Sequence, residues 1–204
     1  MLRALTRPFS FTKFLPVLLL AALGLLSGCG INNIPTYDEA AKAAWGQVEN
    51  QYQRRADLVP NLVETVKGFA KQEKDVLVQV VEARAKATQM TVPKDIVNNP
   101  AAFKQFQQNQ DGLTSALARL MVVVEKYPDL KSNQNFLELQ SQLEGTENRI
   151  SVARRDYIEA VKNYNTELRT IPGRWWASLM YSDAKVKETF TSAPEAKDAP
   201  KVKF

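Results

Sequence analysis

The sequence contains no histidine and only one cysteine in 204 residues. Without histidine, the chain has no Ser-His-Asp triad, no HExxH zinc site and no imidazole to act as a pH switch. The single cysteine, Cys29, provides neither an internal disulfide nor a CxxC site. A phosphate-binding loop of the form GxxxxGK(S/T) is also absent. We therefore expect no catalytic residues, no metal and no cofactor, and an enzyme that works without histidine is the least favoured alternative.

Basic residues are in excess only at the start of the chain. The formal charge is +5, from 27 basic and 22 acidic residues. Arg3, Arg7 and Lys13 precede the first acidic residue, Asp38, and the rest of the chain mixes both signs. Because no block of basic residues forms a phosphate-binding stripe, we expect no nucleic-acid partner.

The first 28 residues have the pattern of a lipoprotein signal peptide. Three basic residues precede an uncharged run at 14–26, which has the length of a signal-peptide core and is short for a membrane span. Leu26-Ser27-Gly28-Cys29 follows and resembles a bacterial lipobox, in which the cysteine thiol takes a diacylglycerol before cleavage. We predict cleavage before Cys29, and a covalent lipid on Cys29 that includes an N-acyl chain such as palmitate. The alternative is an uncleaved, single-pass inner-membrane anchor.

Both alternatives place the body of the protein across the membrane, facing the periplasm. Basic residues precede the apolar run and none follows it until Lys42, which is the positive-inside arrangement. Gly30 follows the cysteine, rather than the aspartate that retains lipoproteins at the inner membrane. In a Gram-negative cell this favours the outer membrane. Residues 29–36 are predicted to form a tether between the lipid and the folded domain.

Long proline-free windows predict an all-α domain over residues 37–190. The windows cover 36–59, 61–92, 101–127 and 129–171, and they are rich in residues that favour helices. Apolar residues recur in them at alternating spacings of three and four, which is typical of helices packed on helices in bundles and coiled coils. In the third window these are Phe103, Phe106, Gln110, Leu113, Leu117, Leu120 and Val124. In the fourth they are Phe136, Leu139, Leu143, Thr146, Ile150, Ala153, Tyr157, Ala160 and Tyr164.

The capping residues, prolines and short loops between the windows predict an elongated antiparallel four-helix bundle. Asp57 is expected to cap a helix with Pro60 in its first turn, after a short loop at 56–58. Asn99 is expected to cap the third helix, and Ser132 or Asn133 the fourth. Short loops make neighbouring helices antiparallel. Residues 191–204, rich in Ala, Pro and Lys, are predicted to form a mostly flexible tail.

Each predicted helix contains one internal glycine. They are Gly46, Gly68, Gly112 and Gly145. Glycine in a helix interior costs about 1 kcal/mol relative to alanine. Two explanations are open: close approach of helices, within the bundle or between copies, and tolerated substitutions on exposed faces.

Residues 48–70 carry a family resemblance, with the sequence VENQYQRRADLVPNLVETVKGFA. This stretch resembles the signature of the LemA family of bacterial envelope proteins, and its core Arg-x-Asp-Leu-x-Pro-Asn-Leu is specific. Further matching positions are Glu73, Ala83-Arg84-Ala85, Tyr164-Asn165, Ile171-Pro172 and Pro200-Lys201-Val202-Lys203-Phe204. The resemblance implies an N-terminal membrane anchor and an antiparallel helical bundle, without an established catalytic activity. Relatives are associated with magnetosome membrane formation and with membrane proteases, and in many of them the anchor resembles an uncleaved transmembrane helix.

Two polar groups are candidates for a structural role. Arg54, Arg55, Asp57 and Asn61 are expected to form a helix–helix corner, and the alternative is a ligand or partner site. Glu73 and Arg84 lie at apolar positions of the second window, where a charge needs a partner. We predict that they join Arg54 or Arg55, and Tyr164 or Asn165, in one polar network between helices, which can specify register.

The segment Arg174–Tyr181 has aromatic residues at Trp175, Trp176 and Tyr181. Such residues suit a membrane interface or a partner groove. The alternative is that they cover the open end of the bundle.

These observations predict a lipid-anchored envelope protein that acts as a helical scaffold or adaptor. Its expected partners are the lipid bilayer, envelope proteins not yet identified, and a second copy of itself. The second hypothesis is a membrane-remodelling or membrane-organising protein that self-assembles, with the Trp175–Trp176 segment touching lipid.

Overall fold

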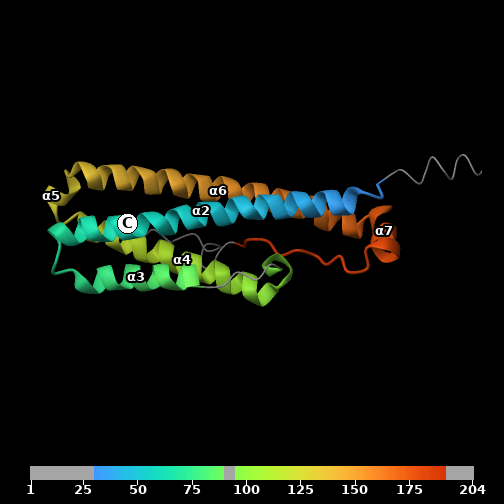
Figure 1. Ribbon diagram of the computed structural model, residues 1–204, viewed down its shortest axis with the longest axis horizontal. Helices are drawn as coiled ribbons and strands as arrows, with labels where there is room; N and C mark the ends of the chain where they lie inside the picture. The colour runs from blue at the N-terminus through green and yellow to red at the C-terminus, as the bar shows by residue number, and fades with distance from the viewer. Residues whose placement is uncertain (1–29, 90–94, 192–204) are drawn as a thin grey trace, which may run out of the picture.

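The computed structural model describes residues 30–89 and 95–191 (Figure 1). The described residues are mostly helical and contain no strand. The helices are α2 (Asn33–Phe69), α3 (Lys74–Gln89), the 3-10 turn η2 (Ile96–Asn98), α4 (Pro100–Val124), α5 (Pro128–Lys131), α6 (Gln134–Arg169) and α7 (Gly173–Met180). The predicted signal peptide, Cys29 and the tail from residue 192 lie outside the described residues.

Four long helices form an elongated antiparallel bundle, as predicted. α2 and α6 lie side by side along the whole molecule, α3 packs on α4, and α2 also packs on α3. The start of α2, the end of α6 and α7 lie together at one end of the bundle, which we call the N-terminal end (Figure 1). The opposite end carries α5 and the turn between α2 and α3, and we call it the distal end.

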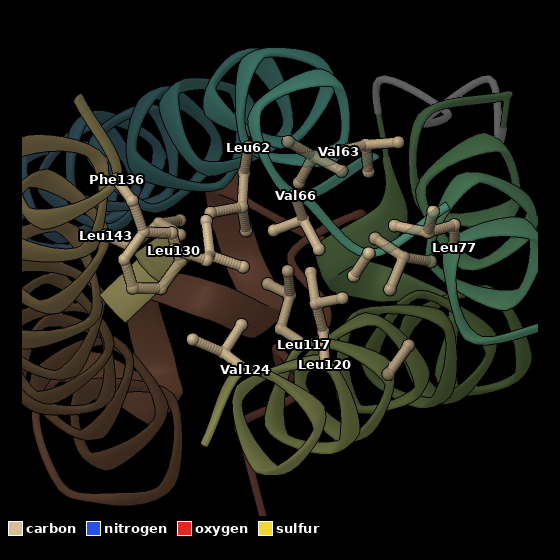
Figure 2. Packing of buried hydrophobic residues seen from close by; sticks show 14 of the residues in the cluster. Leu62, Val63, Val66, Leu77, Leu117, Leu120, Val124, Leu130, Phe136 and Leu143 are labelled. Atoms are coloured by element: carbon tan, nitrogen blue, oxygen red, sulfur yellow. The ribbon is translucent and has the colours of Figure 1, made fainter. Parts of the chain in front are cut away.

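The core consists of two clusters of buried side chains. The distal cluster draws on all four long helices, with α2 and α4 facing each other across it (Figure 2). The second cluster lies nearer the N-terminal end and is rich in aromatic rings, which belong to Trp45, Tyr52, Phe103, Phe106, Tyr157 and Phe190. All seven seam positions predicted for α4 are buried. The seam predicted for α6 is buried except at Leu139 and Ala160, which are partly exposed.

The predicted boundary at 56–58 is wrong, because α2 continues through Pro60 to Phe69. Asp57 lies inside the helix and accepts a hydrogen bond from Gln53 Nε2 at 2.8 Å, so it caps nothing. Proline lacks the N–H that would bond the carbonyl four residues earlier, which here belongs to Ala56. Arg84 Nε donates to that carbonyl at 2.8 Å and supplies the missing bond. The turn that the sequence placed before Pro60 lies instead at residues 70–73, after the helix.

Other helix ends agree with the sequence. Asn99 accepts a hydrogen bond from the backbone N–H of Ala102 at 3.1 Å, with Pro100 at the first helical position. Asn133, rather than Ser132, caps α6 by accepting from the N–H of Phe136. At the start of the bundle, α2 begins at Asn33, so part of the predicted 29–36 tether is helical.

The helix glycines do not allow close approach within the bundle. A Cβ added at Gly46, Gly68 or Gly112 would meet no atom within 4 Å, and at Gly145 it would touch only the side chain of Arg149. Of the two explanations, close packing inside the bundle is therefore wrong for these positions.

Candidate interaction surfaces

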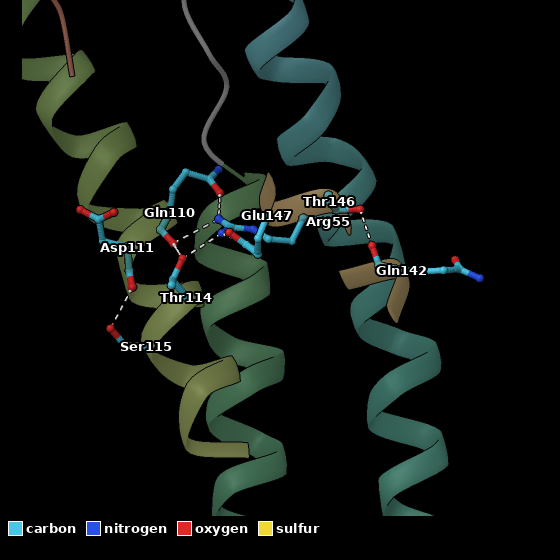
Figure 3. Close-up of polar contacts among 8 residues, drawn as sticks. All are labelled: Arg55, Gln110, Asp111, Thr114, Ser115, Gln142, Thr146 and Glu147. Carbon is cyan, nitrogen blue, oxygen red and sulfur yellow. Dashed lines mark hydrogen bonds and ion pairs between the residues drawn. The ribbon is translucent and has the colours of Figure 1, made fainter. Parts of the chain in front are cut away.

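Arg55 is the centre of a buried polar network in the middle of the bundle. Its side chain is 1% exposed although it carries a charge. One guanidinium nitrogen donates to Thr114 Oγ1 at 2.8 Å and to Glu147 Oε1 at 3.0 Å. The other donates to the side-chain oxygen of Gln110 at 2.6 Å and to its carbonyl at 3.2 Å (Figure 3). Arg55 thereby joins α2 to both α4 and α6, which satisfies most of a charge that would be costly to bury alone.

The other members of the predicted corner are exposed. Arg54, Asp57 and Asn61 all lie on the solvent side of α2. The corner itself does not exist, because the helix is continuous there. Arg55 alone of this group faces the core.

The single network predicted around Glu73 and Arg84 is divided into separate contacts. Glu73 accepts a hydrogen bond from the hydroxyl of Tyr127 at 2.9 Å at the distal end. Arg84 bonds the carbonyl of Ala56 near the middle of α2. Neither contact includes Arg55, and Asn165 belongs to a third site near the N-terminal end. Sequence spacing showed that these polar groups face other helices but not which groups meet.

That third site holds a buried lysine, Lys187, which is 4% exposed. Its ammonium group lies 2.7 Å from Asp38 Oδ1 and 4.7 Å from the centre of the Tyr164 ring. Asn165 bonds both the N–H and the carbonyl of Lys187, at 2.9 and 3.0 Å. Burial opposes ionisation of Asp38, but hydrogen bonds from Lys187 and Lys42 outweigh it and lower the pKa of this carboxyl. The site ties the chain after α7 to the first turns of α2.

The segment after α7 also adds an aromatic ring to the core, which the sequence did not predict as a contact. Phe190 packs against Trp45, Phe103 and Tyr157, with ring centres 5.0–6.1 Å apart. The hydroxyl of Tyr157 donates to the carbonyl of Glu188 at 2.7 Å. A lone phenylalanine without helical spacing was the only indication in the sequence.

The aromatic residues predicted to touch a membrane or a partner lie in or beside α7 but differ in exposure. Trp175 is 63% exposed, whereas Trp176 and Tyr181 are half-buried. The indole nitrogen of Trp176 is buried without a hydrogen-bond partner. α7 packs on α2 and α6, so Trp176 helps to cover the end of the bundle while Trp175 faces outward.

A groove of about 740 Å³ runs between α4 and α6 in the distal half. Its floor is apolar and consists mainly of Leu117, Met121, Val124, Phe136, Leu137 and Leu143. Three glutamates line it, at Glu125, Glu144 and Glu147, together with Lys131, which pairs with Glu125. The groove is therefore apolar with an acidic rim.

A second groove, of about 540 Å³, lies between α2 and α3, also in the distal half. Its floor includes Val78 and Val81, which are about half exposed. Three lysines line it, at Lys67, Lys71 and Lys74, together with Glu82 and with Glu64, which pairs with Lys67. Because α2 packs on α3 and α6, and α3 on α4, the two grooves lie on opposite sides of the bundle.

The described residues contain no group of acidic or cysteine side chains placed to hold a metal ion. Among the helices within the described ranges, none has an apolar stretch long enough to cross a bilayer. The described surface offers two apolar grooves with charged rims and the exposed side of α7 as candidate binding surfaces.

Comparisons with known proteins agree with the resemblance seen in the sequence. The magnetosome proteins MamQ 1 and MamQ 2 of Paramagnetospirillum magneticum are each 26% identical over 185 residues, covering 83% of this chain and 67% of theirs. MamQ of Magnetospirillum gryphiswaldense is 25% identical over 209 aligned positions, covering 91% of this chain and 76% of its own. The LemA family profile matches residues 44–204, which is most of the described bundle and the tail. The chain therefore belongs to the LemA family.

Proposed function

We propose that this protein is a membrane-anchored scaffold of the bacterial cell envelope, which binds other envelope proteins through its two distal grooves and catalyses no reaction. The observation that carries the proposal is the position of the grooves. Both have apolar floors, and both lie in the half of the bundle remote from the N-terminal end. A surface that must meet partners gains from being held away from its own attachment point.

The attachment point is a lipid on Cys29. Only residues 30–32 separate this cysteine from the first residue of α2, and three residues span about 10 Å at most. Two or three acyl chains hold a protein on a bilayer stably, whereas one does not. Membership of the LemA family, and the likeness to magnetosome proteins, support a place at a membrane of the envelope. The outer membrane, with the bundle in the periplasm, is the favoured site in a Gram-negative cell.

The anchor is tested by the intact mass of the protein purified from membranes. A mass that corresponds to cleavage before Cys29 plus acyl chains would support the proposal. A mass that retains Met1 would contradict lipidation and indicate a single-pass inner-membrane anchor.

The grooves are tested by photo-crosslinking in cells, with a benzophenone amino acid at single surface positions. Leu137 and Val81 each lie in one groove and are exposed. Val152 is an exposed valine of α6 that lines neither groove, and it serves as the matched control. We expect discrete crosslinked proteins from Leu137 or Val81 and none from Val152. Equal crosslinking at all three positions, or none at any, would contradict a scaffold that works through the grooves.

A second function, self-assembly along the membrane, is favoured by the charges of the two grooves. The α2–α3 groove is lined by three lysines and two glutamates, and the α4–α6 groove by three glutamates and one lysine, so the first has an excess of positive charge and the second of negative charge. The grooves face in opposite directions. If the α2–α3 groove of one copy binds the α4–α6 groove of the next, the copies are joined head to tail. Such contacts build rows rather than closed dimers. Rows of tethered copies would organise the membrane beneath them.

Self-assembly is tested by chemical crosslinking of the protein on vesicles. Lys71→Glu reverses a charge in the α2–α3 groove, and Lys104→Glu reverses an exposed charge on α4 that lines neither groove. We expect crosslinked oligomers for the native protein and for Lys104→Glu, fewer oligomers for Lys71→Glu, and a decline with salt. Oligomers that do not change with Lys71→Glu would contradict this arrangement.

A further inference from the structure

The N-terminal end of the bundle exposes an apolar face that no contact in the fold explains. Trp175 and Leu179 are four residues apart in α7, so they share one side of this helix, and Ile171 lies in the turn just before it. Ile171, Trp175 and Leu179 are 65%, 63% and 77% exposed, and Met180 beside them is 55% exposed. In a helix of only eight residues, leaving these side chains in water forfeits much of the available hydrophobic stabilisation.

Contacts place the first described residues of the chain beside the turn that leads into α7. Asn33 Nδ2, in the first turn of α2, donates to Glu167 Oε1 at 3.2 Å, just before the turn that leads into α7. A Cβ on Gly30 would lie 3.6 Å from Pro172 Cγ, so the first described residue is next to the start of α7. Cys29 directly precedes Gly30. Acyl chains on this cysteine would therefore bring a bilayer to the end of the molecule that carries α7.

The polar neighbours of the face match the chemistry of a lipid headgroup layer. Trp175 combines a large apolar ring with an N–H donor, and tryptophan gathers at membrane interfaces for this reason. Arg174 and Arg169 are exposed and lie close in sequence to the apolar side chains. Their long apolar stems can lie along the acyl boundary while the guanidinium groups meet lipid phosphates.

We propose that α7 lies in the headgroup region of the membrane that holds Cys29, with Ile171, Trp175 and Leu179 facing the acyl chains. Trp176 stays packed on the bundle and holds α7 in place. The lipid on Cys29 and α7 then form two points of attachment, which hold the bundle in one orientation. At 1.5 Å per residue, the part of α6 that lines the α4–α6 groove, from Asn148 back to Phe136, lies about 30–50 Å along the helix axis from the end at Arg169. The inference rests on the proposed anchor but not on the proposed scaffold role.

The test uses the full-length, lipidated protein in vesicles of phosphatidylcholine and phosphatidylglycerol with brominated acyl chains, which quench nearby tryptophans. We expect the brominated lipids to quench the tryptophan fluorescence of the native protein. Trp175→Phe should remove most of this quenching, and Trp176→Phe should remove little of it. Trp45, which is buried in the aromatic cluster of the bundle, provides fluorescence that the lipids do not reach. Leu179→Glu should also reduce quenching, whereas Val152→Glu, on an exposed part of α6, should not.

Sedimentation with the vesicles separates failure of the anchor from failure of the inference. Protein that sediments with vesicles but is quenched equally in the native form and in Trp175→Phe would overturn contact between α7 and lipid, and would leave the anchor in place. Protein that does not sediment with vesicles would overturn both. Shielding of Trp175 from soluble acrylamide in native membranes, without quenching by brominated lipids, would overturn the inference in favour of a protein partner.

Discussion

Arg84 donates a hydrogen bond from Nε to the carbonyl of Ala56 at 2.8 Å, and this carbonyl is the one that Pro60 leaves without a helical donor. The contact explains how α2 continues through a proline that normally ends a helix. It also links two separate parts of the sequence that resemble the LemA family, because Pro60 lies in the first part, residues 48–70, and Arg84 in the second, residues 83–85.

The first prediction is that Arg84→Leu destabilises the protein by about 1–2 kcal/mol, because the carbonyl of Ala56 becomes buried without a partner. In a Pro60→Ala background, the restored N–H can donate to the same carbonyl, so the cost of Arg84→Leu should fall. A double-mutant cycle measured by urea unfolding gives this coupling directly. Lys86→Leu, at an exposed position of the same helix, is the control and should change stability little. Equal costs of Arg84→Leu in both backgrounds would refute the compensation.

The second prediction concerns the buried guanidinium of Arg55. Arg55→Lys keeps the charge, but all three N–H donors of lysine are on one nitrogen. That nitrogen cannot reach Gln110, Thr114 and Glu147 together, as the two separate guanidinium nitrogens do. We expect a loss of about 2–3 kcal/mol, and a melting temperature lower by several degrees. Arg54→Lys, one residue earlier and exposed, is the control and should have almost no effect. A similar loss in both variants would show that the network is not what stabilises this region.

The third prediction is that stability depends on the ionised form of Asp38. Asp38→Asn leaves the ammonium group of Lys187 without its carboxylate and should cost about 1–2 kcal/mol at pH 7. Glu39→Gln removes a neighbouring carboxylate that pairs only at the surface, and should cost less than about 0.5 kcal/mol.

The dependence on pH follows from the direction of the pKa shift. The folded state lowers the pKa of Asp38, so this carboxyl contributes stability above its unfolded pKa of about 3.9. The contribution is lost as pH falls through the folded pKa. Urea unfolding at a series of pH values should therefore show the difference between native protein and Asp38→Asn shrinking below about pH 4. A difference that grows in acid would contradict this assignment.

The fourth prediction contrasts two glycines. Gly112→Ala places a Cβ in open space within a helix and should stabilise the protein by about 1 kcal/mol. Gly173→Ala places a Cβ against the carbonyl of Glu167 at the start of α7 and should destabilise it by about 1–3 kcal/mol. Thermal unfolding of the two variants distinguishes them. If Gly112→Ala stabilises the fold yet removes oligomers on vesicles, this glycine serves contact between copies.

The fifth prediction is that the segment after α7 stabilises the whole bundle. Phe190→Ala should cost about 3 kcal/mol, because the ring is packed among aromatic side chains of three helices. The fluorescence of Trp45 should shift to longer wavelength as water reaches the cluster. Phe69→Ala, at a phenylalanine that is 42% exposed, is the control and should cost under about 1 kcal/mol. An unchanged stability in Phe190→Ala would mean that the segment is not anchored by this ring.

The helical seams were predictable because they depend on spacing alone. A residue at a three-four interval from apolar neighbours lies on their side of the helix whatever the helix packs against, which is why the whole seam of α4 is buried as expected. Two of the three helix starts predicted from the sequence are confirmed, also for a local reason. Asn99 and Asn133 cap helices through bonds to their own next turn, whereas Asp57 does not because a distant arginine lets the helix continue.

The sequence by itself determined the class of fold and the family, because these depend on composition, periodicity and short motifs. The leader, with Cys29 as the lipid-bearing residue, stays a prediction from the sequence. Only the tertiary structure decided which polar groups meet. Arg55 bonds Gln110 and Glu147. Arg84 donates to the carbonyl of Ala56, and Lys187 pairs with Asp38. The physical reason is distance along the chain. Helical spacing shows which residues share a face, but what packs against that face depends on segments far apart in sequence.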